Sequence, residues 1–71
     1  MSNGFIVKDR HGLYISAPRG WSWSEAKGRA VRTPDDKSPE LGRRPYVFAT
    51  HLAAKRQASA FVDATVIELR S

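Results

Sequence analysis

The sequence contains no cysteine, and its two histidines, His11 and His51, lie forty positions apart. These absences exclude a disulfide framework and a zinc site built from clustered cysteine and histidine ligands. We therefore expect no metal and no cofactor, and a core held together by aliphatic and aromatic packing alone. The absence of cysteine also fits a reducing, intracellular setting.

Long apolar stretches are missing as well. The run Phe5-Ile6-Val7 near the N-terminus is far shorter than the core of a signal peptide or a membrane span. We expect a cytoplasmic protein that does not engage a membrane.

Catalytic groupings are also lacking. Asp35-Asp36 is a carboxylate pair, but it lies in a proline-rich stretch that provides neither the burial nor the positioning that acid–base chemistry needs. Neither histidine has an arrangement of serine, cysteine or aspartate typical of a nucleophile around it. No glycine-rich phosphate loop occurs. We expect no catalytic residue, so the chain is predicted to bind rather than to catalyse.

What the sequence does have is positive charge. Twelve lysines and arginines oppose seven aspartates and glutamates, giving a net charge of +5 and a pI near 10.3. Residues 1–34 carry six basic and two acidic groups, residues 35–40 one and three, and residues 41–71 five and two. Such a field favours nucleic acid, nucleotides or an acidic protein surface as partner. The plainer interpretation is a solvated basic surface.

The first third of the chain predicts strands. Residues 5–8 and 13–17 are runs of strand length, and the intervening residues 9–12 end in a glycine suited to a hairpin turn. Residues 21–23 continue as an extended segment with both indoles on one side. Ser24 then resembles the N-cap of one or two turns of helix.

The rest of the chain predicts a loop, a helix and two further strands. Residues 31–45 hold three prolines and the clustered acidic residues, which indicates a surface loop. Residues 46–48 predict a short strand, residues 51–62 a helix capped by Thr50, and residues 64–69 a closing strand. The apolar stripe expected on that helix consists of Ala54, Ala58, Phe61 and Val62, and the expected common face of the last strand is Thr65, Ile67 and Leu69.

These elements predict an α+β fold in one domain, residues 1–71. Their order is strand, strand, short helix, loop, strand, helix, strand. The simplest arrangement is a small antiparallel sheet of three to four strands with one main helix packed on one face. The other face would be open to solvent or to a partner, and an exposed sheet edge could pair with a second copy to give a homodimer.

The two tryptophans allow two interpretations. One or both complete the core, because each buries a large area. Alternatively, one indole lies with Tyr14 on the uncovered sheet face, where it could stack a base or anchor a protein partner. The candidate partner-binding residues are Tyr14, Arg19, Trp21 and Trp23.

Clusters of basic residues form a second candidate site. The candidate anion- or nucleic-acid-binding residues are Lys27, Arg29, Arg32, Arg43, Arg44, Lys55 and Arg56. Such groups contact phosphates, although they equally suit a solvated charged surface. No helix-turn-helix and no RNA-recognition signature accompanies them.

Four short motifs carry a resemblance to other proteins. They are Phe5-Ile6-Val7-Lys8-Asp9 ahead of Gly12-Leu13-Tyr14-Ile15-Ser16, Gly20-Trp21-Ser22-Trp23, Phe48-Ala49-Thr50 ahead of Ala54 and Ala58, and Val66-Ile67-Glu68-Leu69. With these motifs the chain resembles a loose class of small phage and prophage accessory proteins. It departs from them at residues 31–45, because those proteins usually pass directly from the Ala-Arg segment into Phe-x-Thr.

The resemblance implies a phage-type accessory protein that acts in the host cytoplasm. Many such proteins inhibit or redirect host machinery, including defence systems such as CRISPR effectors. We therefore expect a partner in a host protein complex that handles nucleic acid. The alternatives are a small basic domain that binds DNA, RNA or a nucleotide directly, and a structural component of the virion.

Overall fold

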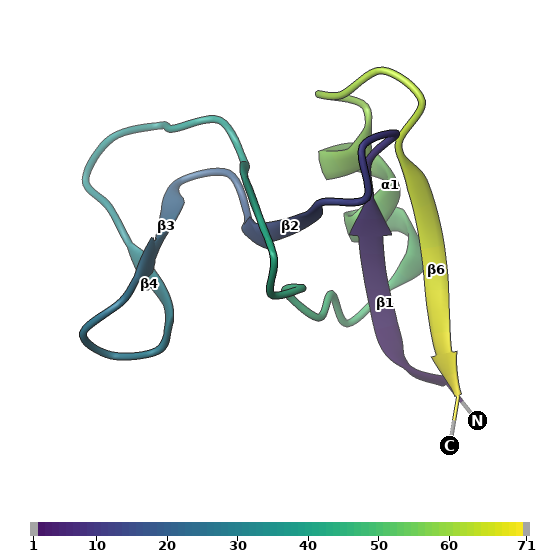
Figure 1. Cartoon of the computed structure of the whole chain (residues 1–71), viewed down its shortest axis with the longest axis horizontal. Coiled ribbons are helices and arrows are strands. Elements are labelled where there is room, and N and C mark those ends of the chain that lie inside the picture. Colours follow the sequence, from purple (N-terminus) through teal and green to yellow (C-terminus); the bar gives the residue numbers. More distant parts are fainter. Residues whose placement is uncertain (1, 71) are drawn as a thin grey trace.

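The computed structural model describes residues 2–70, and it contains six strands and one helix (Figure 1). In chain order these are β1 (Ser2–Lys8), β2 (Tyr14–Ala17), β3 (Trp21–Ser24), β4 (Arg29–Arg32), β5 (Glu40–Gly42), α1 (His51–Ala58) and β6 (Thr65–Arg70). The predicted α+β class with one main helix is confirmed. The sheet content is larger than predicted, because the strands form a four-stranded sheet and a separate two-stranded one.

The four-stranded sheet has the order β5-β2-β1-β6 and is antiparallel throughout. The predicted first hairpin is present, with Lys8 opposite Tyr14 at its closed end. Its turn is fixed by the carboxylate of Asp9, which accepts hydrogen bonds from the backbone N–H groups of His11 and Leu13 at 3.0 and 2.8 Å. An aspartate that bonds nearby backbone groups in this way favours a tight turn.

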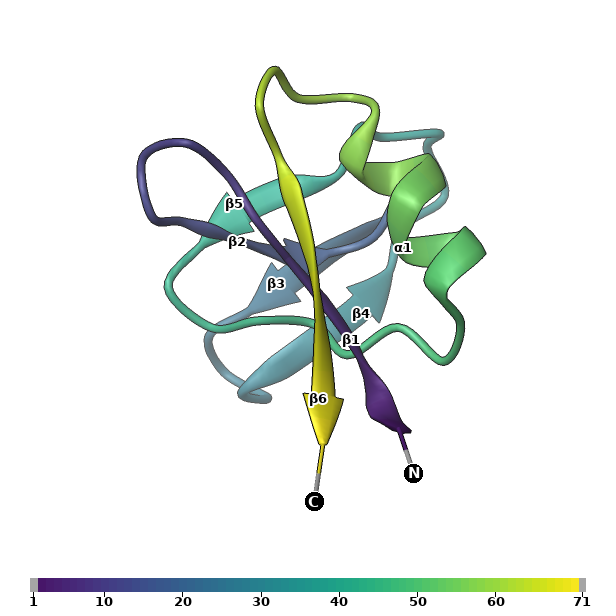
Figure 2. The same ribbon diagram turned by 90° about the vertical axis from the view of Figure 1, so that its right-hand side faces the viewer.

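The helix packs against β1 and β6 of this sheet, and it lies beside these two strands in the end-on view (Figure 2). Val7 and Ile15 lie in the core with Ala54 and Ala58 of α1 and with Phe48. The two alanines are small, so the helix can approach the strands closely. Packing of this kind contributes most of the stability of so short a helix.

The helix begins where the sequence predicts and ends earlier. Thr50 is its N-cap, and the Thr50 hydroxyl accepts the N–H of Ala53 at 3.1 Å. The predicted end at residue 62 is wrong, because the helix stops at Ala58 and a turn follows. Phe61 still packs on the core from that turn, whereas Val62 is 70% exposed. The predicted apolar stripe therefore holds only over the true helix and Phe61.

The predicted short helix after Ser24 is also wrong. The hydroxyl of Ser24 does accept the N–H of Lys27 at 3.2 Å, as an N-cap would. However, the N–H of Gly28 bonds back to the carbonyl of Ser24, and Gly28 has a φ of +64°. This left-handed residue reverses the chain, so that β3 pairs with β4 as a second hairpin.

Residues 31–45 are only partly a loop. Their first two residues end β4, and residues 40–42 form β5, which pairs with β2 at the edge of the sheet. The true connection is residues 33–39. The strand predicted over 46–48 reduces to one bridge between Phe5 and Phe48, whose backbone groups bond reciprocally at 2.9 and 2.7 Å.

The β3–β4 hairpin stands at one end of the molecule, away from α1 (Figure 1). In the view from the opposite end, β6 and β1 lie in front of it (Figure 2). It contacts the sheet through β2 and β5. The faces of the hairpin are therefore not covered by the helix, which matters for the two tryptophans on β3.

We predict that Gly4→Ala strongly destabilises the fold. Gly4 has a φ of +115°, and a Cβ there would clash with Val47 Cγ1 and lie 3.0 Å from the Phe48 carbonyl oxygen. The backbone strain and the overpacking together should cost about 3 kcal/mol or more in urea unfolding. Gly28→Ala is the matched control, because its φ is also positive but nothing lies within 4 Å, so it should cost only about 1 kcal/mol. Equal losses for the two variants would contradict the packing at Gly4.

Candidate partner-binding site

The two tryptophans lie on the same face of the β3–β4 hairpin. Trp21 is opposite Arg32 and Trp23 is opposite Ala30, so alternation places all four side chains together. We call these four residues the hairpin face. Both tryptophans are partly exposed.

Neither indole belongs to the hydrophobic core in the part of the chain that the structure describes. The partly buried apolar residues that pack on that core are Phe5, Leu41, Tyr46, Ala53, Phe61, Ala64 and Val66. Full burial of a tryptophan is a large stabilising contribution, and both indoles are buried only in part. The second interpretation places an indole beside Tyr14 on the open face of the sheet. Both indoles instead lie on the separate two-stranded hairpin, where they are partly exposed.

Trp23 forms one wall of a cleft of about 450 Å³ between the hairpin and β5. We call it the Trp23 cleft; its lining is Ser16, Trp23, Glu25, Glu40, Leu41, Gly42, Arg43 and Arg44. The guanidinium of Arg44 lies 5.8 Å from the Trp23 ring centroid, within cation–π range. The Ser16 hydroxyl donates to the Arg44 carbonyl oxygen at 2.6 Å, which anchors the segment that carries Arg44.

The cleft also contains two carboxylates. The backbone N–H of Trp23 donates a hydrogen bond to Glu40 Oε2 at 3.1 Å, and Lys37 Nζ lies 3.6 Å from Glu40 Oε1. Glu40 therefore ties β3 to the edge strand β5. Glu25 lines the same cleft and forms no ion pair with any residue in the range 2–70. Its carboxylate is free to accept hydrogen bonds from a ligand.

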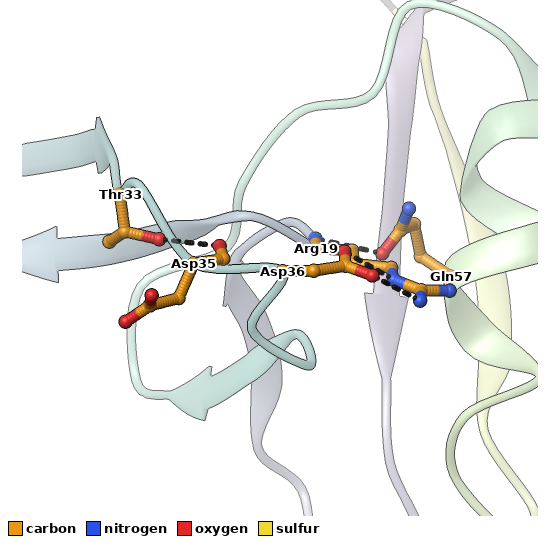
Figure 3. A network of polar contacts seen from close by, with 5 residues as sticks. All are labelled: Arg19, Thr33, Asp35, Asp36 and Gln57. Atoms are coloured by element: carbon orange, nitrogen blue, oxygen red, sulfur yellow. Dashed lines mark hydrogen bonds and ion pairs between the residues drawn. The ribbon is translucent and has the colours of Figure 1, made fainter.

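Arg19 is held by Asp36 in a two-pronged ion pair (Figure 3). Its Nε and Nη2 atoms donate to the two carboxylate oxygens at 2.8 and 2.6 Å. The hydrogen bond and, second, the charge of Arg19 lower the pKa of Asp36, and the same contacts raise the pKa of Arg19. The backbone N–H of Arg19 donates to Gln57 Oε1 at 3.0 Å, so the 33–39 connection and the helix meet at this residue.

Arg19 and Trp21 share a shallow pocket beside the hairpin face. Arg32, Thr33 and Asp36 also line this pocket. The Thr33 hydroxyl lies within hydrogen-bond distance of the carbonyl oxygens of Gly20 and Asp35, which fixes the start of the connection. Arg19 thus lies beside Trp21, as the partner-binding prediction requires, but two of its donors are already engaged.

The remaining predicted residues are spread over the molecule. Tyr14 lies under Lys8 Nζ, 6.0 Å from the ring centroid. Arg29 is opposite Ser24 and so falls on the other face of the hairpin from the indoles. Lys55 and Arg56 are on α1, at the far end of the molecule from the hairpin tip with Lys27 (Figure 1). The seven basic residues therefore form no single patch. Arg32 lies opposite Trp21, Arg43 and Arg44 line the Trp23 cleft, and the other four lie elsewhere.

Two features are absent from residues 2–70. That range contains no group of three histidine, aspartate or glutamate side chains that could hold a metal ion. It also contains no helix that is long and apolar enough to span a bilayer.

We predict that the Arg19–Asp36 pair makes a small, pH-dependent contribution to stability. Because the folded state lowers the pKa of Asp36, the contribution is complete above its ordinary value of 3.8 and is lost as the pH falls below it. Both side chains are exposed, so the contribution is small and falls with added salt. Melting curves between about pH 2 and 6 should show the difference between wild type and Asp36→Asn shrinking toward low pH. A difference in melting temperature that does not change with pH would contradict a stabilising Arg19–Asp36 ion pair.

The chain was compared with family models, curated proteins and solved structures. No family model, no curated protein and no solved structure matches it. The hairpin face and the Trp23 cleft are therefore the features that bear on its function.

Proposed function

We propose that this chain is a non-enzymatic, phage-type accessory protein of the host cytoplasm. It binds a host protein complex that handles nucleic acid and modulates that complex, most simply by inhibiting it. The hairpin face is the contact surface, and Arg19 flanks it.

One observation carries this proposal: two partly exposed indoles share the hairpin face and lie outside the core. Arg32 is directly opposite Trp21, and Arg44 lies over Trp23. Tryptophan and arginine are the residues most enriched among those that dominate binding energy at protein interfaces. The position of the hairpin at one end of the molecule gives a partner access to it (Figure 1).

Direct binding of DNA or RNA is the second candidate function. It is supported by Arg43 and Arg44, which flank an indole on which a base could stack. It is weakened by the separation of Lys55 and Arg56 from the hairpin, because a strand could not follow all seven basic residues along one groove. The protein partner therefore remains the first proposal.

We predict that affinity purification from host lysate recovers a protein partner, and that nuclease treatment does not release it. Trp21→Ala should reduce recovery about tenfold or more, as expected for an interface anchor. Arg29→Ala is the control, because this side chain lies on the opposite face of the hairpin.

Circular dichroism shows whether each variant is folded, and Arg32→Glu tests the same face without removing an indole. Recovery that is unchanged by both Trp21→Ala and Arg32→Glu would contradict the proposed surface. Release by nuclease would instead favour direct binding of nucleic acid.

We also propose a homodimer through the outer edge of β6. This strand ends the sheet order, so one row of its backbone N–H and C=O groups faces away from β1. Ile67 is 36% exposed, and six paired residues would extend the sheet across a two-fold axis. Analytical ultracentrifugation should show a concentration-dependent dimer, and Ile67→Lys should weaken it. A monomer at all concentrations would contradict it.

A further inference from the structure

We infer that the Trp23 cleft binds a guanine nucleotide, either as a free 5′-monophosphate or as the terminal nucleotide of a single strand. The inference goes beyond the contact with a host protein and does not depend on it. It rests on three kinds of side chain that the fold brings together from β3, the following turn and the segment after β5.

The first requirement is a surface on which a base can stack. Trp23 is partly exposed, and the guanidinium of Arg44 lies over its ring at 5.8 Å from the centroid. Indoles and guanidinium planes both stack nucleic-acid bases in single-stranded sites. Neither group is needed by the hydrophobic core among residues 2–70, so both can serve a ligand.

The second requirement is a group that binds phosphate. Arg43 and Arg44 are exposed at the same cleft, and neither forms an ion pair with a residue that the structure describes. Guanidinium groups match the geometry of phosphate oxygens and donate to two of them at once. The Ser16–Arg44 hydrogen bond fixes the backbone from which Arg44 extends.

The third requirement distinguishes the base. Guanine presents two neighbouring N–H donors, N1–H and N2–H, on its Watson–Crick edge, and a carboxylate can accept both together. Adenine offers only one donor there, beside an acceptor that a carboxylate repels. Glu25 is the carboxylate in this cleft without an ion-pair partner among residues 2–70. Glu40, in contrast, already accepts a hydrogen bond from the backbone N–H of Trp23 and pairs with Lys37. Glu25 therefore favours guanine.

The space available agrees with a nucleotide. The cleft volume of about 450 Å³ lies in the usual range for small-molecule sites. Gly42 lies on its lining beside Ser16, and a Cβ at Gly42 would come within 2.6 Å of the Ser16 hydroxyl oxygen. The small residues keep the space beside the indole open for a ligand.

The test uses a Trp21→Phe protein, in which Trp23 is the remaining tryptophan of the two in the sequence. Its fluorescence is titrated with GMP, guanosine, AMP and a short oligonucleotide that begins with a 5′-phosphorylated guanosine. We expect saturable quenching by GMP below about 1 mM, and affinities about tenfold lower for guanosine and for AMP. An oligonucleotide that binds about tenfold tighter than GMP would identify the strand end as the ligand; equal affinity would identify the free nucleotide.

Three variants separate the roles of the side chains. Arg44→Ala should weaken GMP binding about tenfold, and Glu25→Gln should remove the preference for GMP over AMP. Arg29→Ala, on the opposite face of the hairpin, should change neither. Isothermal calorimetry on the same variants gives a second readout that does not depend on the fluorescence of Trp23.

Two results would overturn the inference. A folded protein that shows no saturable signal and no heat with GMP at about 1 mM would eliminate the site. Equal affinities for GMP and AMP would eliminate the role of Glu25. Both results would leave the proposed protein partner intact, because recovery of that partner is measured with Trp21→Ala and Arg32→Glu.

Discussion

The double-sided burial of strand β2 is the constraint on which the rest of the structure depends. Ile15 is fully buried in the core that also contains Ala54 and Ala58 of α1, and Ser16, which points to the opposite face, is only 5% exposed. One edge of β2 pairs with β1 and the other with β5. A four-residue strand thus joins the helix-covered half of the domain to the half that carries the hairpin. The Ser16–Arg44 hydrogen bond is part of the same junction, because it holds the segment after β5 against β2.

This arrangement determines where the binding groups lie. A chain of 71 residues buries only about 60% of the surface that its unfolded form exposes, so its core is small. The core is completed by aliphatic residues, alanines and Phe48, without either indole. Trp21 and Trp23 are consequently left on a hairpin, each beside an arginine. The hairpin face and the Trp23 cleft are therefore direct consequences of how little of this sequence the core can accommodate.

Local patterns in the sequence predicted much of the fold. The first hairpin follows from its turn residues, and the N-cap at Thr50 follows from its hydroxyl. The predictions were wrong where one local sequence pattern fits two structures, or where a strand pairs with a partner far away in the sequence. The Ser24 hydroxyl accepts a hydrogen bond from the N–H of Lys27, a contact that an N-cap and this hairpin turn both make. The left-handed Gly28 reverses the chain and so gives the turn instead of a helix. Strand β5 has three residues and depends on β2, twenty-three residues before it, so no local pattern reveals it. Because β5 was missed, the meeting of Trp23 with Arg43 and Arg44 could not be predicted, and neither could the roles of Glu25 and Glu40.

The central claim is that Trp23 lies outside the core, against Arg44, in an open cleft. Acrylamide quenching of the Trp21→Phe protein tests this claim directly, because Trp23 then supplies the fluorescence. We predict efficient quenching in the folded protein, stronger quenching after Arg44→Ala, and an unchanged free energy of unfolding in that variant. Weak quenching typical of a buried indole, or unfolding caused by Arg44→Ala, would contradict the account.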